Sequence, residues 1–325
     1  MRAVFLDFGS VSRDDLNCTA LDQAISPWRY YHDSSDQEIL QRICDVEVVV
    51  SNKVFLNRSA IEAATHLKLI CVAATGYNNV DLEAAAEHEI AVCNVRNYAT
   101  PSVVQHVFLL MLSLIRHFVD YQELVKRGDW QSSQFFCPMD FPIQELTGKT
   151  LGIIGYGVLG KAVAQVAQAF GMDVLIAEHK NKTPRSGRIA FDEVIGRSDF
   201  ITLHCPLSPD THHLICQREF ALMKASAYLI NTARGELINE IDLLQCLSSG
   251  RIAGAAIDVI QEEPPSQDNL ILRYQSNNLI ITPHIAWASQ ESRQRLIDQL
   301  ADNIRNFFQH KPFNQVTDAL GELHQ

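Results

Sequence analysis

A glycine-rich turn between an apolar strand and a helix constrains the fold of this chain more than any other feature. The apolar run Leu151–Ile154 leads directly into Gly155-Tyr156-Gly157-Val158-Leu159-Gly160, which is the pattern G-x-G-x-x-G. Apolar residues then recur at helical spacing, at Leu159, Val163, Val166 and Phe170. The first glycine permits a tight turn, the second lets the backbone approach a pyrophosphate, and the third lets the helix pack close to the strand. The pattern predicts a dinucleotide site at a helix N-terminus, where an anion is stabilised.

The acidic residue after the next predicted strand bears on which dinucleotide would bind. That strand ends at Ala177-Glu178, and Glu178 lies 23 residues after Gly155. A carboxylate there can accept hydrogen bonds from a ribose diol and would repel a 2′-phosphate, which favours NAD over NADP. NADP stays possible, since the cations between Lys180 and Arg188 could neutralise a phosphate or could form a solvated loop. The turn and Glu178 could also be a plain packed turn followed by a surface acid.

Short apolar strands alternate with amphipathic segments along most of the chain. Strands are predicted at Ala3–Leu6, Val46–Val50, Leu69–Ala73, Ala91–Cys93, Thr150–Ile154, Val174–Ala177, Phe200–His204, Tyr228–Asn231, Ala255–Val259 and Leu279–Thr282. Helices are predicted to begin at capping-box patterns in residues 35–38 and 59–62, at Asp81 and at Pro101, and to cover 158–170, 217–224, 239–248 and 289–309. Such alternation is typical of α/β folds, in which helices cover mostly parallel sheets. At 325 residues we expect two α/β units, the second around residues 100–287.

Composition excludes several classes of partner. The chain has 27 Lys and Arg against 38 Asp and Glu, whereas proteins that bind nucleic acid or anionic membranes use clustered basic surface. We therefore expect no nucleic-acid partner and no membrane segment; the longest uncharged run, residues 97–115, is interrupted by polar residues and is predicted to be a buried helix. Eight cysteines without C-x-x-C spacing indicate reduced thiols in a cytoplasmic protein. No metal site is expected, because His204, Cys205 and His212-His213 lack a further ligand at metal spacing.

Three predicted strands of the second unit end in polar residues, where an α/β sheet normally binds its ligand. The segments are Asn231–Gly235, Asp258–Pro265 and Thr282–Trp287. From them, Arg234, Glu263 and His284 form a coherent set for reducing a 2-keto acid. Arginine binds a carboxylate through two hydrogen bonds, histidine donates a proton to the carbonyl oxygen, and glutamate fixes the imidazole tautomer. Taken singly, they could instead be a surface ion-pair residue, a solvated loop acid and a core histidine.

Several of these motifs, in this order, resemble those of the D-isomer-specific 2-hydroxyacid dehydrogenases. The resemblance extends over nearly the whole chain, and the matching segments are Ala74–Asp81, Leu151–Gly160, His204–Leu207, Asn231–Gly235, Asp258–Pro264 and Pro283-His284. It implies that Arg234, Glu263 and His284 are catalytic, with Glu263 preferred over Glu262 because it directly precedes a proline. One departure is Glu178, which stands where the family usually has Asp and lengthens the arm toward the ribose.

The same resemblance implies an NAD-dependent oxidoreductase, with NADP possible, and a set of ligand contacts. Coenzyme contacts are expected from Gly155, Tyr156, Gly157, Val158, Leu159, Gly160, Glu178, His204, Cys205, Pro206, Thr211, Thr232, Ala233, Arg234, Asp258, His284 and Ala286. Substrate contacts are expected from Asn52, Ala74, Thr75, Gly76, Arg234, His284 and Trp287. Among the coenzyme contacts, Asp258 would hold the nicotinamide carboxamide.

The resemblance also implies two Rossmann-like or flavodoxin-like parallel-sheet domains, with the cofactor domain inserted into the substrate domain. Residues 1–99 with 288–325 would form the substrate (lid) domain and residues 100–287 the NAD-binding domain, around a cleft that closes by a hinge motion. A homodimer is expected through the cofactor domain. The apolar helix from Pro101 to Phe118 could serve that interface or could be a plain core helix. Its apolar stripe has ordinary core spacing, at Val103, Val107, Leu110, Leu114 and Phe118.

Two further segments are most similar to one branch of the family, that of glycerate dehydrogenase or hydroxypyruvate reductase. These segments are Trp130–Pro142 and His284–Ser289. The similarity implies hydroxypyruvate or glyoxylate as the 2-keto acid partner. Two alternatives stay open, a lactate-type substrate and a non-enzymatic NAD-sensing protein similar to the C-terminal-binding-protein corepressors.

Overall fold

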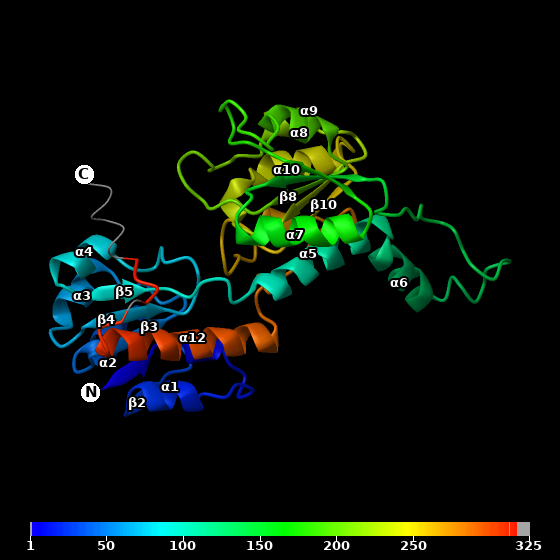
Figure 1. Ribbon diagram of the computed structural model, residues 1–325. Helices are drawn as coiled ribbons and strands as arrows, with labels where there is room; N and C mark the ends of the chain where they lie inside the picture. Colours follow the sequence, from blue (N-terminus) through cyan, green and yellow to red (C-terminus); the bar gives the residue numbers. More distant parts are fainter. Residues whose placement is uncertain (1, 312, 317–325) are drawn as a thin grey trace. The chain divides into compact units, whose positions relative to one another are not determined.

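The structure, a computed structural model, describes residues 2–311 and 313–316. The chain divides into two units, Met1–Ala99 with Ala288–Gln325, and Thr100–Trp287. The last part of the predicted substrate domain, residues 317–325, lies outside the described residues. Each unit contains one parallel sheet with helices against it, which confirms the predicted α/β class (Figure 1).

The unit Met1–Ala99 with Ala288–Gln325 has a five-stranded parallel sheet in the order β2-β1-β3-β4-β5. Its elements are β1 (Ala3–Phe5), η1 (Phe8–Ser10), α1 (Thr19–Ala24), β2 (Trp28–Tyr30), α2 (Asp36–Ile43), β3 (Val48–Ser51), α3 (Arg58–Ala63), β4 (Leu69–Val72), α4 (Leu82–Glu87), β5 (Ala91–Cys93) and α12 (Gln290–Phe308). Every residue of β1, β3 and β4 is buried. Continuous burial of this kind is typical of parallel strands that helices cover on both faces. The strand order is the flavodoxin-like one.

Side-chain caps explain where the helices of this unit begin. At α2 the predicted capping box forms, and the Ser35 amide donates to the Glu38 carboxylate at 2.9 Å. Asp81 caps α4, as predicted. The second predicted box is wrong, because Asn57 accepts from the Ala60 amide at 2.9 Å and starts α3 two residues earlier. A short amide side chain is as good a cap as a hydroxyl, so its presence upstream decides the start.

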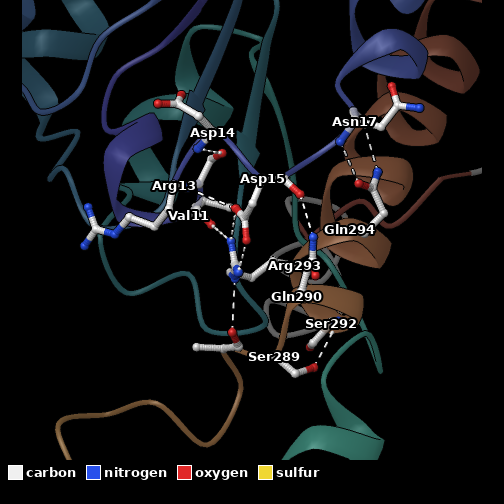
Figure 2. A network of polar contacts seen from close by, with 12 residues as sticks. Val11, Arg13, Asp14, Asp15, Asn17, Ser289, Gln290, Ser292, Arg293 and Gln294 are labelled. Atoms are coloured by element: carbon white, nitrogen blue, oxygen red, sulfur yellow. Dashed lines mark hydrogen bonds and ion pairs between the residues drawn. The ribbon is translucent and has the colours of Figure 1, made fainter.

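The closing helix α12 is fixed to the loop after β1 by a polar network at its first turn (Figure 2). Both terminal amino groups of Arg293 donate to the Asp15 carboxylate, at 2.8 and 2.6 Å, and Nη1 also donates to the Val11 carbonyl at 3.1 Å. Gln294 exchanges hydrogen bonds with the Asn17 backbone at 2.8 and 2.9 Å. These contacts, with apolar burial farther along the helix, join segments 278 residues apart.

The unit Thr100–Trp287 has a six-stranded parallel sheet in the order β11-β10-β9-β8-β6-β7. Its elements are α5 (Thr100–Ile115), α6 (Phe118–Arg127), β6 (Thr150–Ile154), α7 (Val158–Ala169), β7 (Asp173–Ile176), α8 (Phe191–Arg197), β8 (Phe200–Leu203), α9 (Gln217–Leu222), β9 (Tyr228–Asn231), η2 (Gly235–Leu237), α10 (Glu240–Ser248), β10 (Gly254–Ile257), α11 (Leu270–Arg273) and β11 (Leu279–Ile281). The chain moves from β6 outward to β7 and then returns past β6 to β8. At such a reversal, ligands of α/β sheets bind at the carboxyl ends of the strands.

The apolar helix predicted from Pro101 to Phe118 is two helices in the structure. α5 ends at Ile115, His117 adopts a left-handed φ of +50°, and α6 begins at Phe118. Of the predicted apolar stripe, Val103, Val107, Leu110 and Leu114 are buried, as expected of a core helix, whereas Phe118 is exposed. In the described part of the chain, no single helix is long and apolar enough to span a membrane; α5 and α6 pass that test only together, and they are bent by 60°.

The sequence-based prediction missed several short elements and placed the buried face of α7 partly wrongly. The structure adds β2, α1, α8 and α11, of three to seven residues, which are too short for apolar periodicity to reveal. Along α7 the buried residues are Gly160, Val163, Ala164 and Ala167. The predicted stripe is therefore right at Val163 and wrong at Phe170, which is exposed. Small residues face the strand because α7 packs close to it.

A fully buried carboxylate, that of Glu219, ties α9 to the loop after β7. Lys180 Nζ lies 2.8 Å and Arg218 Nη1 2.7 Å from its Oε1, and the Cys216 amide donates to its Oε2 at 3.2 Å. Burial by itself raises the pKa of a carboxyl group. Here the hydrogen bonds and the two cations outweigh burial and lower the pKa of Glu219 to about 2.

We expect Glu219 to stabilise the fold above pH 4.5, its ordinary pKa, and to lose that effect as the pH falls toward 2, because the unfolded chain binds the proton more tightly. The Glu219→Gln variant should be less stable than wild type at pH 7 and closer to it at pH 3. Urea unfolding at both pH values measures the difference. Glu145→Gln, which changes an exposed glutamate, is the control. An equal loss at both pH values would contradict the linkage.

Candidate active site

The carboxyl ends of β9, β10 and β11 lie at one edge of the second sheet and carry the residues predicted to be catalytic. β9 leads into Arg234, β10 into Glu263 and β11 into His284. The three strands are parallel neighbours, so the segments after them share that edge. Gly235 packs so closely on the segment after β10 that a Cβ there would lie 2.0 Å from the Ile260 carbonyl carbon. The structure therefore brings the arginine segment against the segment that ends in Glu263.

The glycine turn between β6 and α7 is built as the sequence predicts. Gly155 has a φ of +94°, and a Cβ there would lie 2.4 Å from the Cys205 amide nitrogen. A Cβ at Gly160 would lie 2.2 Å from the Gly155 carbonyl oxygen, so only glycine lets α7 approach this closely. At Gly157 a Cβ would meet nothing within 4 Å among the described residues. An open stretch of backbone therefore lies at the N-terminus of α7, where an anion would be stabilised.

His284 and Glu263 form a direct pair. Nδ1 of His284 lies 2.5 Å from Oε2 of Glu263, and Oε1 of Glu263 accepts from the Ile260 amide at 3.1 Å. The Trp287 indole donates to the His284 carbonyl at 2.9 Å. The carboxylate is thus oriented through both of its oxygens, and it orients the imidazole in turn. Because Nδ1 is held by Glu263, Nε2 is the ring nitrogen that can exchange a proton with a ligand.

A buried carboxylate, that of Asp258, holds the His284 segment in a strained conformation. His284 has a φ of +54°, a left-handed value that residues other than glycine rarely adopt. Its amide donates to the Asp258 carbonyl at 2.7 Å, and the Asp258 carboxylate accepts from the amides of Ile285 and Ala286 at 3.0 and 2.8 Å. Strained residues persist where several bonds converge on one segment. The sequence predicts Asp258 as a contact of the nicotinamide carboxamide, whereas the structure places its oxygens on the protein's own backbone.

His106 of α5 completes this support, and the sequence analysis missed it. Its Nε2 lies 2.9 Å from Thr282 Oγ1 and 3.4 Å from Asp258 Oδ1. Since the Thr282 hydroxyl donates to Asp258, the Nε2–H of His106 donates to Thr282. Burial raises the pKa of Asp258, but the bonds from His106, Thr282 and the backbone amides outweigh it and keep that pKa below its usual range. The available signal was an isolated ionisable residue in an otherwise uncharged helix.

Arg234 is a half-buried arginine without a carboxylate partner among the described residues. Its Nη1 donates to the Ala233 carbonyl at 2.7 Å. The Asn231 side chain donates to the Arg234 carbonyl at 2.7 Å and accepts from the Ala233 amide at 3.0 Å, which fixes the turn after β9. Most of the guanidinium N–H donors stay available, and their planar fork matches a carboxylate.

The segment after β8 lies beside the glycine turn and begins with His204 and Cys205. Burial lowers the pKa of His204 to about 4 and raises the pKa of the Cys205 thiol to about 11, so both are neutral at pH 7. The Thr211 hydroxyl donates to the Pro206 carbonyl at 2.8 Å, within the segment itself. A protonated thiol beside a neutral imidazole makes neither a thiolate nucleophile nor a thiolate metal ligand. In residues 2–311 and 313–316, no three metal-binding side chains gather at one place.

Glu178, predicted as a ribose contact, is turned into the protein. Its side chain is 2% exposed. Its oxygens accept from the His179 amide at 2.9 Å and from the amide and Nε of Arg185 at 3.1 and 2.6 Å, and Nη2 of Arg185 adds a further bond. The Arg185 guanidinium holds the pKa of Glu178 well below its usual range. At neutral pH the carboxylate is therefore ionised and already paired.

In the first unit, the predicted substrate residues follow β3 and β4, which are parallel neighbours. Asn52 is buried after β3, and the Asp7 carboxylate accepts from the amides of Asn52 and Lys53 at 2.9 and 2.6 Å. The segment Ala74-Thr75-Gly76 follows β4, and the Thr75 hydroxyl donates to the Val95 carbonyl at 3.0 Å. The two predicted segments thus share the carboxyl edge of this sheet.

The residues at the edge of the second sheet fit a dinucleotide. Thr232 Oγ1, one residue past β9, is buried and has no hydrogen-bond partner among the described residues. Leaving a buried hydroxyl unpaired costs about 1–3 kcal/mol, which a ligand atom bonded to it would recover. The open backbone at Gly157 and the N-terminus of α7 suit a phosphate at the same edge. A ligand with both polar and anionic groups matches this combination.

Comparisons with known proteins found a matching family model, related sequences and a similar solved structure. Residues 108–286 match the model of the "D-isomer specific 2-hydroxyacid dehydrogenase, NAD binding domain". The chain is 44% identical over 308 residues to the glycerate dehydrogenase of Methylorubrum extorquens, covering 93% of this chain and 97% of that protein. It is 38% identical over 323 residues to the hydroxypyruvate reductase of Blautia hydrogenotrophica, covering 97% and 99%. The solved structure of an acyclic imino acid reductase (Bsp5) with NADPH and D-Arg has a TM-score of 0.85 at 29% identity, covering 97% of this chain and 100% of that one.

The contact of His106 with Thr282 and Asp258 gives a testable expectation for stability. The His106→Leu variant should lower the free energy of unfolding by about 1–3 kcal/mol, because a buried carboxylate and a hydroxyl lose a donor. The His106→Gln variant, whose side chain keeps an N–H donor, should recover most of the loss. Urea unfolding of the three proteins measures this. Equal losses in both variants would show that His106 acts only by filling space.

Proposed function

This chain belongs to the D-isomer specific 2-hydroxyacid dehydrogenase family, and from that membership we propose that it interconverts hydroxypyruvate and D-glycerate, with glyoxylate as a second keto acid. The substrate is proposed from the relatives in Methylorubrum extorquens and Blautia hydrogenotrophica, a glycerate dehydrogenase and a hydroxypyruvate reductase. The observation that carries the proposal is Arg234, half-buried and without a carboxylate partner in the described residues, at the same sheet edge as the His284–Glu263 pair. An unpaired guanidinium and an oriented imidazole suit an anionic substrate that gains or loses a proton.

In this proposal Arg234 binds the substrate carboxylate. A guanidinium forms two parallel hydrogen bonds with a carboxylate, and its charge also polarises a carbonyl group on the neighbouring carbon. The Asn231 side chain supports this role, because its hydrogen bonds with the Arg234 carbonyl and the Ala233 amide hold the turn that carries Arg234. A lysine would supply the charge without the fork.

His284 exchanges a proton with the substrate oxygen through Nε2, donating it when the keto acid is reduced and accepting it in the reverse direction. Glu263 holds Nδ1 and stabilises the imidazolium form. General acid–base catalysis by such a group contributes about 10²–10⁴-fold to the rate. Asp258 and His106 act indirectly, because they hold the strained segment that carries His284.

NAD is the coenzyme of this family's matching domain, with NADP possible, and when bound it supplies or takes up the hydride. We propose that the turn Gly155–Gly160 and the N-terminus of α7 hold its pyrophosphate and that Thr232 Oγ1 bonds to it. Thr100–Trp287 is then the coenzyme domain, and Met1–Ala99 with Ala288–Gln325 is the substrate domain. Asn52 and Ala74–Gly76 are proposed as further substrate contacts. The other predicted contacts stay predictions, namely His204, Cys205, Pro206, Thr211, Ala233, Asp258, Ala286 and Trp287.

We propose a reducing, cytoplasmic location from the state of the thiols. All eight cysteines are free. Cys71 and Cys93 face each other on neighbouring strands, fully buried, with their sulfur atoms 3.4 Å apart. A disulfide would require about 2.05 Å, so the two sulfur atoms are not bonded to each other. Thiols persist in this form in reducing compartments.

The proposed homodimer is supported by an exposed apolar segment after α6. Phe135 and Phe136 are 73% and 90% exposed, and Trp130 and Met139 nearby are also exposed. Figure 1 shows this segment extending away from the sheet of its own unit. Exposed aromatic side chains gathered in this way mark a protein–protein contact. We propose that a second copy of this chain covers them, in the coenzyme domain.

The proposed roles predict different kinetic signatures for two variants. Arg234→Lys should raise KM for hydroxypyruvate by about 10–100-fold, because the second hydrogen bond to the carboxylate is lost. His284→Ala should lower kcat by about 10²–10⁴-fold with little change in the affinity for NADH. Oxidation of NADH with hydroxypyruvate, glyoxylate and pyruvate measures both, and fluorescence titration measures NADH binding.

Arg197→Ala and His88→Ala, which change exposed residues elsewhere, are the controls. Activity that neither Arg234→Lys nor His284→Ala affects would remove these residues from the mechanism. Preference for pyruvate would favour a lactate-type substrate, and tight NADH binding without turnover would favour a sensing role.

The dimer proposal predicts that charges in the exposed segment separate the subunits. Phe135→Asp with Phe136→Asp should convert a dimer into a monomer in sedimentation equilibrium, because burying unpaired carboxylates in an interface is costly. Glu145→Gln, a change at an exposed residue outside that aromatic pair, serves as the control. A wild type that sediments as a monomer, or a dimer unchanged in the double variant, would contradict the proposed interface.

A further inference from the structure

The adenosine end of a dinucleotide lies beside the strand that follows the glycine turn, which is β7 in this chain. β7 pairs with β6, and the Ala177 amide donates to the Ile153 carbonyl at 3.0 Å, so Glu178 comes directly after the paired segment. In a site that selects NAD, an acid at this position offers its oxygens to the ribose hydroxyls. Glu178 therefore has the position of a coenzyme-selecting acid.

The Glu178 carboxylate is nevertheless occupied by its own chain. A carboxylate offers about four acceptor positions. Oε1 accepts from the His179 amide and from Nη2 of Arg185, and Oε2 accepts from the amide and from Nε of Arg185. The side chain is only 2% exposed. A ribose hydroxyl would have to displace Arg185 to reach it.

Arg185 has the opposite character, because it is exposed and has donors to spare. Its side chain is 60% exposed. A guanidinium carries five N–H groups, and the bonds to Glu178 use one on Nε and one on Nη2, which leaves about three on the outer edge. Of the other cations in this loop, Lys180 is bound to Glu219 at 2.8 Å and Arg188 to the Ala177 carbonyl at 3.2 Å, whereas Lys182 is exposed. Arg185 is thus the cation that covers the acid.

We propose that the Glu178–Arg185 ion pair sets the coenzyme selectivity of this chain and admits NADPH beside NADH. The proposal rests on the dinucleotide site of the proposed function. A bare carboxylate repels the 2′-phosphate of NADPH, whereas a carboxylate paired with a guanidinium has no net charge to do so. The outer edge of Arg185 can in addition form charge-assisted hydrogen bonds with the phosphate. The binding of NADH loses little affinity, since Glu178 does not accept hydrogen bonds from the ribose hydroxyls.

Fluorescence titration of the full chain with NADH and with NADPH tests this without turnover. We expect the two dissociation constants of the wild type to lie within about tenfold of each other. Arg185→Ala should raise the dissociation constant of NADPH by about tenfold or more, because it removes the phosphate donor and uncovers the acid. It should leave the dissociation constant of NADH within about threefold of the wild-type value. Glu178→Gln should leave the dissociation constant of NADH within about threefold of the wild-type value, and should leave that of NADPH equal or lower it. Arg197→Ala, which removes an exposed arginine paired with Glu193 on α8, is the control.

The possible results separate this inference from the proposed function. If the wild type binds neither dinucleotide, the proposed function itself fails. If it binds NADH and rejects NADPH by more than about a hundredfold, or if Glu178→Gln selectively weakens NADH, only the role of the ion pair is overturned. Thermal unfolding reports whether Glu178→Gln folds, and if it does not, Arg185→Ala and the charge-retaining Arg185→Lys decide the matter. Arg185→Lys should keep NADPH binding closer to wild type than Arg185→Ala does.

Discussion

The bonds of one buried carboxylate, that of Asp258, support the whole candidate active site. An ionised group without water around it is stable only when hydrogen bonds replace its hydration. Asp258 finds them on the amides of Ile285 and Ala286 and on the Thr282 hydroxyl. Because those donors flank His284, the cost of leaving the carboxylate unpaired keeps the histidine at its left-handed φ of +54°. The free energy of burying a charge is thus used to orient a side chain.

Burial divides the acidic groups near this sheet edge into two kinds. Asp258, Glu178 and Glu219 are buried, and each accepts backbone amide bonds with a histidine, an arginine or a lysine close by. These acids hold segments of the chain in place. Glu263 is more exposed and contacts His284, whose other ring nitrogen can meet a ligand. Acids of the same chemical type therefore have structural or chemical roles according to how much water reaches them.

Motifs with a local physical cause could be predicted from the sequence. The glycine turn depends on the positive φ of Gly155 and on the close approach of Gly160 to the Gly155 carbonyl, which are both local in the chain, although Gly155 also packs against the distant Cys205 backbone. Most strands were predicted within one or two residues, because continuous apolar runs reveal strands buried on both faces. The pairing of a glutamate with His284 was inferred from the polar residues at the strand ends, and the family resemblance favoured Glu263 over Glu262. The short elements were missed because they are too short for apolar periodicity to reveal, and the break at His117 was missed because the apolar pattern continues across this single left-handed residue.

Residue type and order are enough to predict the α/β class, the position of the dinucleotide turn and the set of side chains at the strand ends. The contacts of each polar side chain, by contrast, are known only from the folded chain. Folding turned Glu178 inward onto Arg185, and it brought His106 from α5 to the carboxylate after β10. The reason is physical: a pattern in the chain specifies which groups are available, whereas hydrogen-bond partners are chosen by packing between elements far apart in sequence.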